Sequence, residues 1–389
     1  MQPYAWGSRD AIAKLQGRPV PSPGPEAELW MGAHPSAPSG VERDGRHTTL
    51  DAVIAADPAG ELGADYARRF GGRLPFLLKV LAAGKALSIQ VHPSRGQAQE
   101  GYKADNERGL APGDKNRNYV DDWPKPEILC ALTPFAILAG MRDPADAAAL
   151  LRELGVPALA PLAGDLERAD ARADVLARIL SWAAGERDAL VNDVVAACER
   201  VAAEGGPHAA ACADIVQVSA DHPGDLGIVA SLLLRHAVLQ PGQAVFLPAG
   251  GLHAYLHGTG VELLANSDNV VRAGLTPKHI DIPELLKLTD PAAEVPLLAP
   301  RDLGNGISAY DSPAPEFRLY HVSLGAHEVV LPGEGPRLVL AVSGTLSLRD
   351  SAGATLKLGR GESCFLSDLD RTTRASGPAS AFLASVGEP

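Results

Sequence analysis

The sequence predicts a mainly β protein that is interrupted by one α-helical insertion. Its 389 residues include 40 Gly and 32 Pro, and such frequent turn formers favour short strands over a helical bundle. Apolar runs of strand length recur before residue 143 and again after about residue 237, whereas apolar residues at helical spacing are concentrated between these parts. The chain exceeds the size of a single core, so two or three domains are expected.

Residues 1–142 are expected to form strands and loops, with a short helical segment around Leu50–Arg69. The run Leu74–Leu81 has the length of a strand and one charged interruption, Lys79. A lysine in such a run either lies at a sheet edge, where its ammonium group reaches water, or points into a functional site. Both interpretations of Lys79 stay open.

The stretch Ala86–Pro93 carries the most informative pattern. As a strand with alternating faces, it places Ser88, Gln90 and His92 on one side and Leu87, Ile89 and Val91 on the other. A polar strand face by itself most often indicates only exposure to solvent. A functional interpretation therefore needs further residues elsewhere in the chain.

Two later segments supply such residues. Glu127 opens the apolar run Ile128–Leu132, and a Pro/Gly turn within Leu247–Leu256 places His253 at the start of another strand. Each residue alone has an ordinary explanation, such as an ion pair between Glu127 and Lys125, and the prediction depends on their joint occurrence. Two imidazoles, a carboxylate and an amide oxygen form a complete ligand set for a divalent metal of zinc type. The predicted ligands are Gln90, His92, Glu127 and His253.

From Asp143 the pattern becomes helical. Apolar residues at helical spacing follow in Asp146–Leu154, Asp174–Ala184 and Asp188–Ala203, and Gly/Pro-containing breaks separate these segments. We expect residues 143–225 to form a helical insertion, a small domain or lid support, and we assign no chemistry to it.

The C-terminal part repeats a string found near the second predicted histidine ligand. Leu239–Leu247 (LQPGQAVFL) resembles Leu358–Leu366 (LGRGESCFL), and this alignment places Thr372 opposite His253. We therefore expect residues 300–389 to form a second jelly roll that lacks the metal histidine and binds no metal.

Charge and composition exclude several classes of partner. A net charge of −12 argues against nucleic acid or an anionic membrane surface, so an anionic substrate would need a local basic cluster. The apolar run Ile228–Leu234 is too short for a membrane span. No signal peptide is visible, and the cysteines match no zinc-finger or CxxC spacing, so we expect a reduced, cytoplasmic protein.

Five motifs follow one another along the chain: Tyr4–Ser8, Glu28–Gly32, Gln90–Pro93, Lys125–Glu127 and Ala265–Lys278. In this order they resemble the motifs of the type I mannose-6-phosphate isomerases (phosphomannose isomerases), zinc enzymes on a cupin scaffold. The resemblance runs from Tyr4 to about Asp281 and fades afterwards. It implies two cupin (jelly-roll) β-barrel domains plus a small helical domain: a catalytic cupin made by residues 1–142 and 226–290, and a degenerate one at 300–389.

A second group of charged residues follows His253. The resemblance places Arg272 in the active site, where Lys79 and Lys125 could add the positive field that holds a sugar phosphate. The base that moves the proton stays open among Glu262, Lys125 and a hydroxide on the metal. The family commonly has a histidine where this chain has Pro124, so a mechanism that uses that histidine is in doubt here. The residues expected to contact substrate are Trp6, Ser88, Asp268 and Lys278.

The leading expectation is a monomeric isomerase with one Zn²⁺ per chain, interconverting mannose 6-phosphate and fructose 6-phosphate through a cis-enediol. An Fe(II) cupin oxygenase is a second possibility, because two histidines and a carboxylate also suit that metal. A sugar-phosphate-binding cupin without turnover is a third. Metal analysis separates the first two, and proton exchange from D₂O into C1 or C2 of the sugar separates an enzyme from a binding protein.

Overall fold

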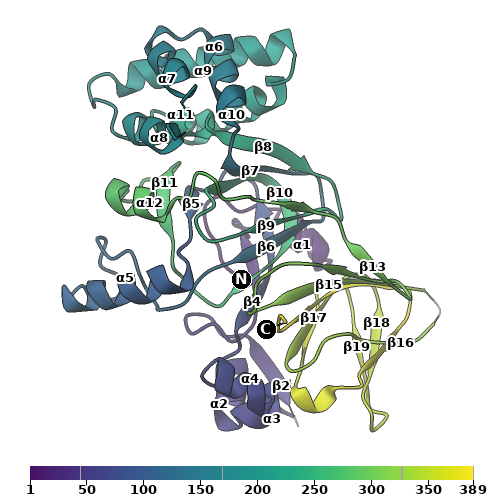
Figure 1. The fold of residues 1–389 in the computed structure, drawn as a ribbon. Helices are drawn as coiled ribbons and strands as arrows, with labels where there is room; N and C mark the ends of the chain where they lie inside the picture. The colour runs from purple at the N-terminus through teal and green to yellow at the C-terminus, as the bar shows by residue number, and fades with distance from the viewer. Residues whose placement is uncertain (44, 169, 326, 389) are drawn as a thin grey trace.

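The computed structural model describes residues 1–43, 45–168, 170–325 and 327–388. It contains two β assemblies, with a group of helices at one end of the first and the second beside the opposite end (Figure 1). This arrangement confirms the predicted class, mainly β with an α-helical insertion. Within the described residues, no helix combines the length and apolar character needed to cross a membrane.

The first assembly is a bent sheet organised around one long strand, β10 (His253–Ala265). The first residues of β10 pair with β5 and β7, and the stretch 258–265 pairs with β4 and β6. One strand thus belongs to both faces of the barrel. The other strands are β1 (Glu28–Met31), β4 (Phe76–Ala83), β5 (Ile89–Val91), β6 (Glu127–Ala131), β7 (Phe135–Met141), β8 (Leu234–Leu239), β9 (Ala244–Leu247), β11 (Val271–Gly274) and β12 (Leu297–Leu298).

Gly258 lies where β10 passes from one face to the other. Its φ of +135° lies in the region that favours glycine, and an added Cβ would lie 2.7 Å from the Phe135 ring. The bend therefore depends on a residue without a side chain. It lets His253 and Glu262, on the same strand, both line the barrel interior.

The helical insertion lies between β7 and β8 and packs on the outside of the barrel (Figure 1). Its core is continuous with one side of the sheet, since its leucines pack with Val91, Leu138 and Ala254. The division into separate domains consequently stays a prediction. The helices are α6 (Pro144–Leu154), η1 (Pro157–Leu159), α7 (Ala160–Asp165), α8 (Arg172–Leu180), α9 (Arg187–Glu204), α10 (Ala209–Asp221) and α11 (Gly227–Ser231).

Shorter elements surround the first barrel. One of them, α5 (Arg95–Glu107), was not expected from the sequence, although Ser94 and Gln97 form a capping box that marks its start. The other elements are α1 (Ala11–Leu15), β2 (Gly40–Arg43), β3 (Arg46–Thr49), α2 (Leu50–Ala56), α3 (Pro58–Leu62), α4 (Ala64–Arg69) and α12 (Ile282–Leu288).

The C-terminal part is a two-sheet jelly roll. One sheet has the order β13-β14-β15-β22-β17-β20, the other β16-β21-β18-β19, and a separate apolar cluster fills the space between them. The elements are β13 (Arg301–Gly304), β14 (Ile307–Tyr310), β15 (Arg318–Leu324), β16 (Val329–Val330), β17 (Arg337–Gly344), β18 (Leu346–Arg349), β19 (Thr355–Leu358), β20 (Ser363–Leu366), η2 (Asp368–Asp370), β21 (Arg374–Ser376) and β22 (Ala379–Ser385).

The sequence prediction for Ala86–Pro93 was wrong in length. Only Ile89–Val91 forms a strand, because this segment pairs briefly with β10 and β11 before α5 begins. Leu87 therefore does not share a face with Ile89 and Val91, and it lines a cavity together with Ser88. Lys79 does not lie at a sheet edge, since β4 runs between β1 and β10.

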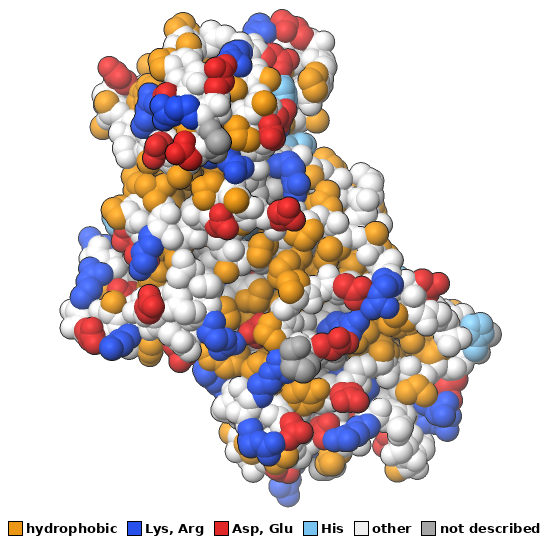
Figure 2. Space-filling model, in the orientation of Figure 1, with side chains coloured by type: hydrophobic (Ala, Val, Ile, Leu, Met, Phe, Trp, Pro, Cys, Tyr) orange, Lys and Arg blue, Asp and Glu red, His pale blue; other side chains and the backbone are white. Residues whose placement is uncertain are grey.

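The surface carries charges of both signs. On the face drawn in Figure 2, the coloured Lys and Arg side chains are interspersed with Asp and Glu side chains. The basic residues expected to hold an anionic substrate have to be sought inside the barrel.

Candidate metal centre and active site

The first barrel brings the predicted metal ligands His92, Glu127 and His253 together. His253, the first residue of β10, lies opposite Gln90 of β5, and Glu127 is the first residue of the neighbouring β6. Ligand atoms of His92, Glu127 and His253 all lie within 4.8 Å of one another. All three side chains are buried, so the cluster lies beneath the surface of the barrel.

Hydrogen bonds orient both imidazoles. His92 Nδ1 lies 2.7 Å from the carbonyl oxygen of Asn269, and His253 Nδ1 lies 3.0 Å from that of Gly251. A carbonyl can only accept, so each Nδ1 carries the proton and each Nε2 presents a lone pair to the centre. This is the tautomer that a metal ligand requires.

Unpartnered polar atoms show that a cation fits this cluster. Among the described residues, His92 Nε2 and Glu127 Oε2 are buried without a hydrogen-bond partner. Leaving such atoms unpaired typically costs about 1–3 kcal/mol each. A divalent ion would satisfy both. The Gln90 amide, 3.3 Å from His253 Nε2, adds an oxygen donor if it presents Oε1.

Lys125 provides positive charge beside the centre. Its Nζ lies 3.0 Å from Glu127 Oε1. Burial alone would raise the pKa of Glu127, but the charge of Lys125 holds it well below its usual range. Burial, with the nearby Lys125 charge, lowers the pKa of His92 to about 4. Both groups are therefore in their metal-binding protonation states at neutral pH.

A row of charged side chains crosses the barrel next to this cluster. Lys79 lies opposite Trp30 of β1 and Glu262 of β10, and its Nζ is 3.4 Å from Glu28 and 3.5 Å from Glu262. Burial raises the pKa of Glu262 to about 7, while Lys79 opposes the shift and the carboxylates of Glu127 and Glu28 reinforce it. Glu262 can therefore both accept and release a proton near neutral pH.

Two residues of this row were missed by the sequence analysis. Glu28 accepts a hydrogen bond from Trp30 Nε1 at 2.7 Å, and Tyr255 donates one to Glu262 Oε1 at 2.9 Å. Both follow the strand alternation, because Glu28 is two residues from Trp30 and Tyr255 is two residues from His253. The signal existed, but it depended on knowing which strands are neighbours.

A cavity of about 670 Å³ opens above the row. Among its lining residues are all the residues predicted as catalytic or substrate-contacting, together with Gln90 and Glu127. His92 and His253 lie buried below it. The predicted residues in the wall are Trp6, Lys79, Ser88, Lys125, Glu262, Asp268, Arg272 and Lys278.

Arg272 and Lys278 form a basic part of the wall. Arg272 on β11 pairs in register with Gln90, so it lies at the metal end of the cavity. The charge of Arg272 and partial burial lower the pKa of Lys278, and burial lowers that of Arg272. Two neighbouring cations in one cavity wall favour an anionic ligand.

A jelly-roll barrel with a buried His–Glu–His cluster beneath a charged cavity defines the metal-binding class of cupins. Residues 1–144 match the family described as phosphomannose isomerase type I, catalytic domain. The chain is 37% identical over 374 residues to the mannose-6-phosphate isomerase of Escherichia coli K12, which covers 94% of this chain and 93% of that protein. Against the Bos taurus enzyme of the same name the identity is 34% over 398 residues, with 94% and 91% covered.

Solved structures give the same result. A zinc-bound mannose 6-phosphate isomerase has 35% identity and a TM-score of 0.89. The Salmonella typhimurium enzyme, bound to fructose 6-phosphate and zinc, has 35% identity and a TM-score of 0.90. Each comparison covers 100% of this chain and 97% of the other. The chain belongs to the type I phosphomannose isomerase family.

Proposed function

We propose that the protein is a zinc-dependent isomerase that interconverts mannose 6-phosphate and fructose 6-phosphate. The observation that carries this proposal is that two buried atoms able to ligate a metal, His92 Nε2 and Glu127 Oε2, have no hydrogen-bond partner. They lie directly below a cavity with basic walls. The named activity of the relatives, and the zinc and fructose 6-phosphate in two of their structures, support it.

Gln90, His92, Glu127 and His253 hold one Zn²⁺ in this proposal. Glu127 is the only anionic ligand, so the centre keeps a net positive charge. When bound, the ion would polarise the sugar carbonyl and stabilise negative charge on the oxygens at C1 and C2, a contribution of several kcal/mol.

Glu262 is the proposed base. It takes the proton from C2 of mannose 6-phosphate and returns it to C1, while O1 gains a proton and O2 loses one, so the cis-enediol forms and collapses without net change in atoms. Its pKa of about 7 suits both halves of this transfer. Lys125 is less suited, because its ammonium group is paired with Glu127.

The cations are proposed to contact different groups of the substrate. Arg272 lies at the metal end, where its planar fork of donors matches the oxygen pair of the enediolate. Lys79 and Lys125 keep positive charge beside the base and the metal ligand. Lys278 is proposed to hold the phosphate, and Trp6, Ser88 and Asp268 to contact the sugar.

We also propose that the enzyme acts as a monomer in the cytoplasm. The cysteines Cys130, Cys198, Cys212 and Cys364 are free thiols, as expected in a reducing compartment.

The deciding experiment is an assay of mannose 6-phosphate conversion by purified protein of known zinc content. We expect turnover that stops on chelation and returns with zinc, and incorporation of solvent deuterium at C1 or C2. Binding of the sugar phosphate without deuterium exchange would indicate a binding protein instead. Iron at the site with an oxygen-dependent reaction would indicate an oxygenase.

A further inference from the structure

Asp268 projects a carboxylate into the cavity, and a histidine outside the cavity lining holds it in place. His34 Nε2 lies 3.3 Å from Asp268 Oδ2. We infer that His34 is a positioning residue that fixes the Asp268 carboxylate for the hydroxyl groups of the sugar phosphate. This inference rests on the proposed function, because it assumes that a sugar phosphate occupies the cavity.

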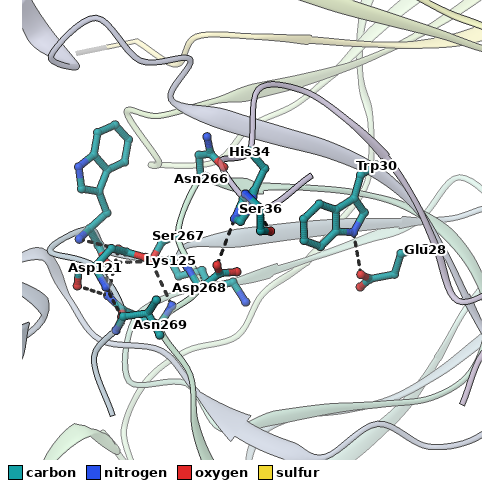
Figure 3. A network of polar contacts seen from close by, with 12 residues as sticks. Glu28, Trp30, His34, Ser36, Asp121, Lys125, Asn266, Ser267, Asp268 and Asn269 are labelled. Carbon is teal, nitrogen blue, oxygen red and sulfur yellow. Dashed lines mark hydrogen bonds and ion pairs between the residues drawn. The ribbon is translucent and has the colours of Figure 1, made fainter. Parts of the chain in front are cut away.

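The tautomer of His34 is set by its own loop. The backbone N–H of Ser36 donates to His34 Nδ1 at 3.2 Å, and the Ser36 hydroxyl lies 2.8 Å from the same atom. An amide N–H can only donate, so Nδ1 accepts and Nε2 carries the proton. The ring therefore presents an N–H donor to Asp268 in its neutral form (Figure 3).

The plane of the imidazole is fixed as well. His34 is only 4% exposed, and its ring packs edge-on against Trp30 with centroids 4.8 Å apart and an interplanar angle of 68°. The indole is in turn held by its hydrogen bond to Glu28. His34 is thus pre-oriented by groups that do not depend on Asp268.

The backbone of Asp268 is fixed from the other side. Its N–H donates to Asp121 Oδ2 at 2.9 Å, and the Ser267 hydroxyl donates to Asp121 Oδ1 at 2.8 Å. Asn269 Nδ2 donates to the Asp121 carbonyl at 2.8 Å, and the Asn269 carbonyl accepts from the metal ligand His92. Figure 3 shows Asp121 among Ser267, Asp268 and Asn269. One short loop therefore positions both the candidate metal ligand His92 and a cavity carboxylate.

With its backbone held, Asp268 keeps freedom only in its side-chain torsions, and the bond from His34 restricts these. The side chain lines the cavity and is 47% exposed, and Oδ2 is the oxygen that His34 contacts. Oδ1 can then accept hydrogen bonds from a ligand. Because a carboxylate oxygen has two lone pairs, it can accept from two neighbouring hydroxyl groups of a sugar. Pre-orientation of this kind improves affinity by reducing the entropy lost on binding.

The test uses two substitutions that separate ring packing from hydrogen bonding. His34→Phe keeps an aromatic ring against Trp30 but loses the donor, whereas His34→Gln keeps an N–H donor. We expect His34→Phe to raise KM for mannose 6-phosphate about tenfold, the usual effect of one lost charge-assisted hydrogen bond, with kcat within about threefold. We expect His34→Gln to stay within about threefold of the wild type in both constants.

A double-mutant cycle with Asp268→Ala, which removes the acceptor, tests whether His34 acts through Asp268. If it does, His34→Phe changes KM by less than about twofold in the Asp268→Ala background. The control is His236→Phe. It removes a buried hydrogen bond between His236 Nε2 and Asp214 Oδ2, which are 2.6 Å apart and lie away from the cavity. This variant should leave KM unchanged.

The outcomes are distinguishable. Equal effects of His34→Phe and His34→Gln, or additive effects in the cycle, would overturn the inference. Absence of turnover in the zinc-loaded wild type would instead contradict the proposed function. In that case the same cycle is measured on the dissociation constant of fructose 6-phosphate by calorimetry, and a coupled effect there still supports the positioning role.

Discussion

Arg272 is half-buried in the cavity wall, opposite Gln90, a proposed metal ligand, and near the cationic Lys278. We expect Arg272→Lys to fold and bind zinc normally but to lose kcat by about a hundredfold, near 3 kcal/mol, because lysine keeps the charge and loses the fork of donors. Measuring kcat and zinc content on the same preparation checks this.

The matched control is Arg200→Lys, at an exposed arginine that pairs with Glu204 on the helical insertion. Its kcat should change by less than about threefold, since exposed ion pairs contribute little. If the Arg272 variant behaves like this control while retaining zinc, Arg272 has no catalytic role.

Glu262 gives the second prediction at this scale. As a base it must be ionised, and burial raises its pKa to about 7. The rate constant kcat/KM should therefore fall as the pH drops below about 7 and level off above it. Glu262→Gln should lower kcat by about a hundredfold to ten-thousandfold, the range for a general base, and should abolish this acidic limb.

Glu26→Gln serves as its control, since Glu26 pairs with the exposed Arg18 on the outside of the same barrel. It should keep the wild-type profile. An unchanged acidic limb in the Glu262 variant would assign the base to another group.

The residues of the site were predictable to different degrees. His92, Glu127 and His253 could be found because their residue types are diagnostic of a metal and their strands are marked by apolar runs. Glu28 could not be found in this way, since its role arises only from the pairing of β1 with β4. Tyr255 reaches Glu262 of the same strand only because β10 bends between them, at Gly258. Register between distant strands is set by packing of the whole barrel, which the local pattern does not contain.

At the scale of elements, β10 joins the candidate metal ligand His253 to the proposed base Glu262 by bending at Gly258. Gly258→Ala should destabilise the fold by about 1–3 kcal/mol, because its φ of +135° strains any side chain and the new Cβ would meet Phe135 at 2.7 Å. Denaturant unfolding measures this change. Where the destabilised variant is still folded, kcat should fall as well.

Gly40→Ala is the control, since nothing lies within 4 Å of an added Cβ at that position. Its free energy of unfolding should change by less than about 0.5 kcal/mol. Equal stability of the two variants would show that the bend in β10 does not depend on glycine.

The helical insertion contributes a residue to the cavity wall. The sequence analysis assigned it no chemistry, yet Asp221 at the end of α10 lines the cavity and pairs with Lys85 at 2.6 Å. The helices themselves were predictable from apolar spacing. Their contribution to the cavity was not, because it depends on how α10 packs on the barrel. We propose that residues 143–225 form a helical domain whose end closes one side of the cavity.

At the scale of the whole molecule, the two jelly rolls are expected to differ in metal binding. We predict one zinc per chain, held by the first barrel, since Thr372 aligns with His253 in the second. His321 in that barrel already contacts the Ser380 hydroxyl at 2.7 Å. Elemental analysis should give one zinc for the wild type and also for His321→Gln. Two zinc ions per chain in the wild type, with only one in His321→Gln, would contradict the prediction.

Zinc should also stabilise the complete chain. The ion binds ligands that only the folded barrel brings within 4.8 Å, so it favours the folded state by mass action, by about 4 kcal/mol at a thousandfold excess over its dissociation constant. We therefore expect chelation to lower Tm by several degrees and abolish activity, with both restored by zinc.

His253→Ala should have the Tm of the chelated protein and no response to either chelation or added zinc. His222→Ala, which changes a cavity histidine outside the ligand set, should keep the full response to chelation. A chelated wild type with unchanged Tm and full turnover would show that neither stability nor catalysis depends on the metal.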